Sequence, residues 1–100
     1  MGLFGFGKKD YAKDFKDAFE NTDITKCIKV TQKWQNSDKH DRNCTNAVVI
    51  LSLFSDKIDP YEVKSLYESA KNRPVENQEL AGWYELTAKL MFKTKGIDID

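Results

Sequence analysis

Apolar side chains recur every three to four positions along most of the chain, and charged residues separate them. In "DYAKDFKDAFE" the apolar positions Tyr11, Phe15 and Phe19 share one side of an α-helix. A second stripe runs from Ile24 to Trp34, and Asp23 before it is a residue type that favours helix N-caps. The polar stretch "QNSDKHD" then predicts the end of this second helix.

The stretch "NAVVILSLF" is almost entirely apolar and admits two interpretations. It is compatible with a buried strand paired with "TKCIKVT", or with a helix at the centre of the core. We favour the helix, because the apolar run extends to Phe54 and no hairpin turn flanks it.

The boundary in "SDKIDPYEV" is the clearest in the chain. Asp59 is expected to cap a helix, Pro60 to occupy its first position and Glu62 to complete a capping box. The residue before Pro74 is disfavoured in helices, so this helix should end near residue 72. A last helix with acidic residues at its start and lysines at its end should stop before Gly96.

The pattern therefore predicts an all-α domain over residues 10–96, between a flexible tail at 1–9 and a short acidic tail at 97–100. The expected helices span about 10–20, 23–35, 42–54, 60–72 and 76–95. Short connections make neighbouring helices antiparallel, so the first two and the next two should each form a hairpin. Ala47 and Ala81 lie 34 positions apart, a spacing typical of stacked helical hairpins.

One segment of the last helix resembles the tetratricopeptide repeat. In "WYELTAKL" the residues Trp83, Leu86 and Leu90 have the spacing of that repeat's first helix, although Thr87 stands where the motif prefers glycine. The resemblance covers about eight residues and implies an architecture of stacked helical hairpins.

Composition excludes several classes of protein. The 100 residues balance 16 basic against 16 acidic side chains, so no global field favours nucleic acid or an anionic membrane. Two cysteines are too few for a disulfide-stapled secreted scaffold, and no window is long and apolar enough for a membrane span. We expect a cytoplasmic protein that binds neither nucleic acid nor a membrane stably.

The opening "MGLFGFGKK" suggests a membrane address, which its details weaken. Myristoylation requires Ser or Thr where Phe6 stands, and glycines disfavour an anchoring helix. An interfacial anchor through Leu3, Phe4 and Phe6 with Lys8 and Lys9 stays open, beside the expectation that the tail folds back on the domain.

Candidate chemistry is sparse. Cys27, His40 and Cys44 offer zinc-compatible atoms, but a structural site needs four ligands and Asp41 is a poor fourth. A nucleophile formed by His40 and Cys44 would require an exposed, electropositive setting and a third orienting group. We expect buried cysteines, a solvated histidine, no metal, no cofactor and no enzymatic activity. The lysines of the second helix, Lys26, Lys29 and Lys33, lack the exposed aromatic residues that single-stranded nucleic acids stack on.

Surface recognition is the remaining expectation. Tyr61 lies off the buried stripe of its helix, with acidic residues nearby. The last helix is apolar over most of its circumference and needs a cover, which a second copy, a partner or the N-terminal tail can supply. The candidate partner-binding residues are Tyr61, Glu62, Glu68, Asp56, Trp83 and Tyr84, with only one of the last two expected to be exposed.

A small, charge-balanced, helical chain of this kind is similar to the small immunity proteins of bacterial contact-dependent inhibition systems. That resemblance implies tight binding to one cognate toxin domain, often a nuclease. The alternative is a tetratricopeptide-like adaptor that docks a peptide or protein.

Overall fold

The computed structural model describes residues 10–99 of the chain. This part contains α-helices joined by short connections and no β-strand. The tail residues expected at a membrane or on the domain (Leu3, Phe4, Phe6, Lys8 and Lys9) lie outside the described residues. The described helices are α1 (Tyr11–Glu20), α2 (Ile24–Asp38), α3 (Arg42–Phe54), α4 (Pro60–Ala70) and α5 (Gln78–Thr94). The all-α prediction is confirmed, and the strand interpretation of residues 47–54 is wrong.

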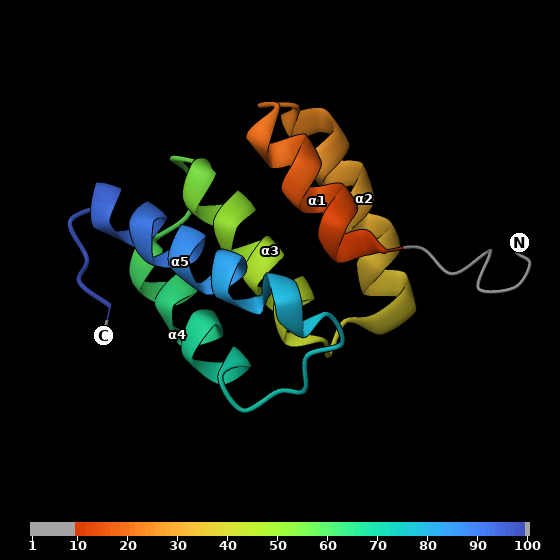
Figure 1. The fold of residues 1–100 in the computed structure, drawn as a ribbon. Coiled ribbons are helices and arrows are strands. Elements are labelled where there is room, and N and C mark those ends of the chain that lie inside the picture. Colours follow the sequence, from red (N-terminus) through yellow and green to blue (C-terminus); the bar gives the residue numbers. More distant parts are fainter. Residues whose placement is uncertain (1–9, 100) are drawn as a thin grey trace, which may run out of the picture.

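The helices are arranged around α3. Helices α1 and α2 lie side by side as one hairpin, α3 and α4 form a second, and α5 lies along α3 (Figure 1). Helix α3 contacts each of the other four helices. Its residues Ala47, Val49 and Ile50 are fully buried, because a helix in this position meets neighbours on nearly every side.

A carboxylate or amide side chain caps the N-terminus of every described helix. The predicted caps Asp23 and Asp59 accept hydrogen bonds from the backbone N–H groups of Lys26 (3.1 Å) and Tyr61 (2.9 Å). Asp59 caps α4 alone, since the exposed Glu62 side chain makes no return bond to it among the described residues. The remaining caps are Asp10, Asp41 and Asn77.

Three boundaries differ from the sequence expectation by two residues or more, and one of them is the end of α4 at Ala70 instead of near residue 72. Helix α2 continues through the polar residues 35–38, which the pattern predicted as a turn. That stretch contains neither glycine nor proline, and its side chains are exposed, so nothing in it breaks the helix. Helix α5 begins at Gln78, because Asn77 caps it by accepting from the N–H of Leu80 (3.3 Å).

Helices α1 and α5 end with the same backbone motif. After α5, Gly96 has a φ of +79°, and Ile97 N–H donates to Phe92 C=O (3.1 Å). After α1, Thr22 holds the equivalent left-handed position with a φ of +55°, and Asp23 N–H donates to Ala18 C=O (2.9 Å). A β-branched residue is strained in this conformation, whereas glycine is not.

Aromatic rings join α5 to the first hairpin. Tyr84 is fully buried and its ring centroid lies 5.7 Å from that of Phe15 and 5.9 Å from that of Trp34. Its hydroxyl donates to the Ala12 carbonyl at 2.6 Å. On the other side of α5, Phe92 meets Tyr67 of α4 edge to face at 5.6 Å. Helix α5 is thus held by both hairpins.

The residues after Gly96 also belong to the packed domain. Ile97 is buried and Ile99 packs partly against the core. The expected acidic tail therefore carries its apolar side chains inward, and only Asp98 between them is exposed.

Candidate functional site

The outer face of α4 presents the most exposed large apolar side chain of the described residues. Tyr61 is 65% exposed. Glu68 lies seven residues further on, which places it almost directly along the same face of the helix. Its carboxylate has no hydrogen bond or ion pair with other described residues. Both predicted residues are therefore accessible, and both are unused by the fold.

Two more apolar side chains precede α4. Phe54 ends α3 with 53% exposure and Ile58 lies in the connection with 43%. We call Phe54, Ile58, Tyr61, Glu62 and Glu68 the helix-4 surface. Exposed aromatic and aliphatic side chains near charged ones are typical of protein interfaces, where a few such residues carry most of the affinity.

Asp56 differs from the other acidic candidates, because its carboxylate already has a partner. It accepts from the Lys95 ammonium at 2.8 Å, and this hydrogen bond lowers the pKa of the Asp56 carboxyl. The pair joins the α3–α4 connection to the end of α5. We therefore leave Asp56 outside the helix-4 surface.

The structure separates the two aromatic candidates of α5. Tyr84 is fully buried, and its hydroxyl is already hydrogen-bonded. It therefore cannot touch a partner, which corrects its place among the candidates. Trp83 is partly buried: its ring meets Phe19 edge to face at 6.1 Å, and the Lys16 ammonium lies 5.7 Å from its centroid. Trp83 is the candidate that remains accessible.

Leu86 and Leu90 form an exposed apolar pair on α5. They are one helical turn apart and are 59% and 55% exposed. The sequence predicted that part of this helix would stay uncovered, and these two leucines are that part. Met91, which follows Leu90, packs partly against the core.

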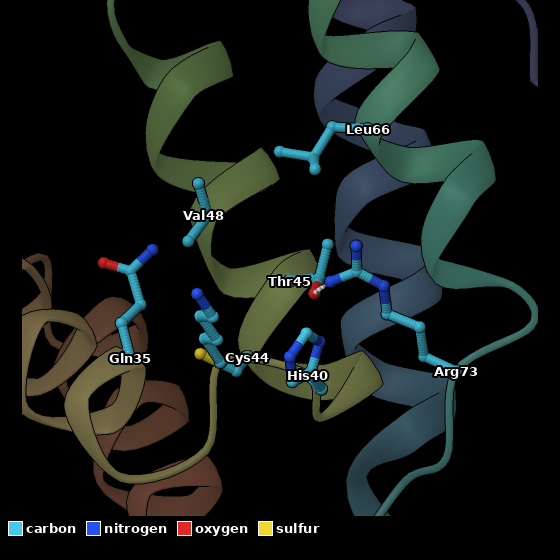
Figure 2. Close-up of a pocket in the computed structure, with 8 residues that line it drawn as sticks. Gln35, His40, Cys44, Thr45, Val48, Leu66 and Arg73 are labelled. Atoms are coloured by element: carbon cyan, nitrogen blue, oxygen red, sulfur yellow. Dashed lines mark hydrogen bonds between the residues drawn. The ribbon is translucent and has the colours of Figure 1, made fainter.

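A groove between α2, α3 and α4 was not anticipated from the sequence (Figure 2). Its volume is about 330 Å³. Cys44, Val48 and Leu66 give it an apolar floor, while basic side chains stand at its edge. Those basic residues are Lys39, His40 and Arg73. Such a groove suits an apolar side chain with a carboxylate beside it.

Arg73 is fixed at this groove by contacts with the start of α3. Its guanidinium donates to the Thr45 hydroxyl at 2.8 Å, as Figure 2 shows. Its own carbonyl accepts from Arg42 Nε at 3.0 Å. Asp41 Oδ1 accepts from the backbone N–H of Glu76 at 3.3 Å, although burial raises the pKa of this carboxyl. These bonds fasten the α4–α5 connection to α3.

His40 and Cys44 both line the groove, but the thiol is unsuited to catalysis. Cys44 is 1% exposed, and burial, together with the smaller effect of the Asp41 and Asp38 carboxylates, raises its pKa to about 12. At neutral pH the side chain is therefore a thiol, whereas nucleophilic attack requires a thiolate. The Cys27 thiol is also buried, and its pKa is raised by the same cause.

Within residues 10–99, no group of three or more His, Cys, Asp or Glu side chains is arranged to hold a metal ion. Cys27 Sγ faces the Phe15 carbonyl at 3.9 Å inside the first hairpin, and Cys44 lies in the groove. The spacing C-x12-H-x3-C thus does not bring its residues together as one ligand set.

The lysines of α2 gather on one side of the first hairpin. Lys26, Lys29 and Lys33 line a hollow of about 340 Å³ together with Tyr11 and Asp14. Tyr11 comes from α1 and stacks on Trp34 at 6.2 Å. The sequence pattern along α2 alone did not reveal this aromatic neighbour, because it belongs to another helix.

No helix in the described part of the chain is long and apolar enough to cross a membrane. Comparison of the chain with protein families, with curated proteins and with solved structures found no match. The helix-4 surface and the grooves are therefore interpreted from their own chemistry.

Proposed function

We propose that the chain is a protein-binding module and that the helix-4 surface is its main interface. The observation that carries the proposal is the 65% exposure of Tyr61, and Phe54 and Ile58, which precede α4 in the chain, are exposed as well. Interface hot spots are enriched in tyrosine.

We further propose that the partner is a cognate toxin domain, which the chain neutralises as an immunity protein in the cytoplasm. Carboxylates beside Tyr61 support a basic partner surface, such as the cleft in which a nuclease holds its substrate. Glu62 and Glu68 are exposed, and neither forms an ion pair with other residues in the 10–99 span.

The test compares interface variants in a pull-down followed by mass spectrometry. Tyr61→Ala and Glu68→Lys should each weaken the complex by about 1–3 kcal/mol while leaving the melting temperature nearly unchanged. Glu79→Lys at the start of α5 makes the same charge change at an exposed glutamate that forms no ion pair with another described residue, and it should bind as the parent does.

The recovered partner then decides between an immunity protein and another binder. An immunity protein should hold one partner with a Kd in the nanomolar range or below, and should abolish that partner's toxic activity in a purified assay. Unchanged binding by both Tyr61→Ala and Glu68→Lys would show that the helix-4 surface is not the interface. The lysine face of α2 would then be the next surface to test.

The groove in Figure 2 favours a second candidate function, an adaptor that docks a peptide. Its apolar floor and basic edge would accept a short segment in which an apolar residue adjoins an acidic one. In that case Leu66→Glu should abolish binding, whereas Tyr61→Ala should not.

The exposed pair Leu86 and Leu90 is the place where a homodimer would form. Leu86→Glu should then shift the sedimentation velocity of the chain to that of a monomer. A parent chain that sediments as a monomer at high concentration would exclude the dimer.

A further inference from the structure

A charged cavity lies between α3, α4 and α5, apart from the helix-4 surface. Its volume is about 290 Å³. Six residues of these helices and of the C-cap of α4 line the cavity, namely Arg42, Asn46, Tyr67, Lys71, Glu85 and Lys89. The sequence gives no sign of it, because these residues are spread over nearly half the chain.

Positive charge exceeds negative charge in this cavity. Three cationic side chains face one carboxylate, that of Glu85. The Arg42 guanidinium forms an ion pair with the Glu85 carboxylate at 3.7 Å. Lys89 has no ion pair in the described part of the chain. An anion would therefore enter a site where two cations are not neutralised by the protein.

The cationic groups are partly held in place. Arg42 Nε donates to the Arg73 carbonyl at 3.0 Å, and this hydrogen bond restricts the orientation of the guanidinium. The Lys71 ammonium lies 5.6 Å from the ring centroid of Tyr67. A ligand would thus meet an arginine that is already oriented, so less conformational entropy is lost on binding.

Two polar side chains that line the cavity have unused hydrogen-bonding capacity. Asn46 is 1% exposed, and its enclosed Oδ1 accepts no hydrogen bond, as is also true of Asn43 Oδ1 outside the cavity. The Tyr67 hydroxyl makes no hydrogen bond with another described residue and is not one of the enclosed unpartnered atoms, so a ligand in the cavity can reach it.

We propose that this cavity binds a small phosphate monoester that carries hydroxyl groups. A phosphate has a charge of about −1.5 to −2 near neutral pH and three acceptor oxygens, which suits the arginine, the lysines and the tyrosine hydroxyl. The ligand's own hydroxyls would donate to the Glu85 carboxylate, which lines the cavity. The cavity volume lies at the lower end of the range for small-molecule sites, so the ligand is small.

The test is calorimetric titration of the full chain with glycerol 3-phosphate at low salt. Saturable binding is expected, with inorganic phosphate at least about tenfold weaker and glycerol alone not binding. These two arms separate the contribution of the phosphate from that of the hydroxyls. Lys89→Gln should weaken glycerol 3-phosphate binding by about tenfold or more, because it removes one of the unpaired cations.

Lys93→Gln is the matched control, since Lys93 lies one turn further along α5, is exposed and does not line the cavity. It should bind as the parent does. Circular dichroism of each variant establishes that it is folded.

Three outcomes would overturn the proposal. The first is an absence of glycerol 3-phosphate binding to the folded parent chain at millimolar concentration. The second is equal binding of inorganic phosphate, because Glu85 would then contribute nothing to recognition of the ligand's hydroxyls. The third is an equal loss in Lys89→Gln and Lys93→Gln, which would indicate attraction by surface charge alone.

Discussion

The hydroxyl of Tyr84 provides a direct test of how α5 is attached to the first hairpin. Tyr84→Phe removes one oxygen and keeps the ring that packs against Phe15 and Trp34. The lost contact is the 2.6 Å hydrogen bond to the Ala12 carbonyl, in a side chain with no exposed surface. No other described hydrogen bond joins α5 to the backbone of α1.

The size of the effect follows from what each partner keeps. An intramolecular hydrogen bond contributes about 0.5–1.5 kcal/mol net, because the unfolded chain bonds to water instead. The Ala12 carbonyl lies in α1 and also faces its helical N–H partner, so it is not left wholly unpaired. We therefore expect a loss of about 1 kcal/mol, which in a domain of this size lowers the melting temperature by roughly 4–8 °C.

Thermal and urea unfolding followed by circular dichroism measure this loss. Tyr61→Phe is the matched control, because it deletes the hydroxyl of an exposed tyrosine that makes no described hydrogen bond. It should change the free energy of unfolding by less than about 0.5 kcal/mol. If Tyr84→Phe unfolds together with the parent, or if both variants lose the same stability, the attachment of α5 does not depend on this hydroxyl.

Two further predictions concern the thiols and the first turn. Cys27 and Cys44 should resist alkylation by iodoacetamide at pH 8 in the native protein and react after unfolding, because both thiols are buried and their pKa values are raised. Mass spectrometry measures the labelling, and rapid labelling of the native protein would contradict the burial of these thiols. Thr22→Gly should stabilise the chain by about 0.5–1 kcal/mol in urea unfolding, since glycine tolerates the φ of +55° that strains threonine. An unchanged or lower stability would mean that the Thr22 hydroxyl, which donates to the Asn21 carbonyl at 2.6 Å, outweighs the strain.

The sequence pattern predicted the helices well because each depends on local information. Stripes of apolar residues and the caps Asp23 and Asp59 act within one or two turns, and the structure places four of the five helix starts within one residue of the prediction. The exception is α5, which was expected from residue 76. Its cap Asn77 is a residue type that favours helix N-caps, so the local signal was present, and the prediction missed it by starting the helix at the acidic Glu76.

The contacts that shape the sites could not be predicted in this way. The groove joins Gln35 to Arg73, and the cavity joins Arg42 to Lys89, so each depends on how separate helices are rotated against one another. Burial of Tyr84 instead of Trp83 has the same origin. The two residues are adjacent on α5, and only the position of α1 determines which of them enters the core.

Polar residues at the start of α3 hold the α4–α5 connection, on which both proposed binding surfaces depend. Arg42, Asn43 and Asp41 bind the backbone of the α4–α5 connection, with Asn43 Nδ2 donating to the Asn77 carbonyl at 2.9 Å. These bonds fix α4 relative to α5 through a connection that would otherwise be free to move. The helix-4 surface and the charged cavity both require that fixed geometry, because a rigid site loses less entropy when a partner binds. The buried polar network at the start of α3 therefore rigidifies the connection that orients the two surfaces to which the proposals refer.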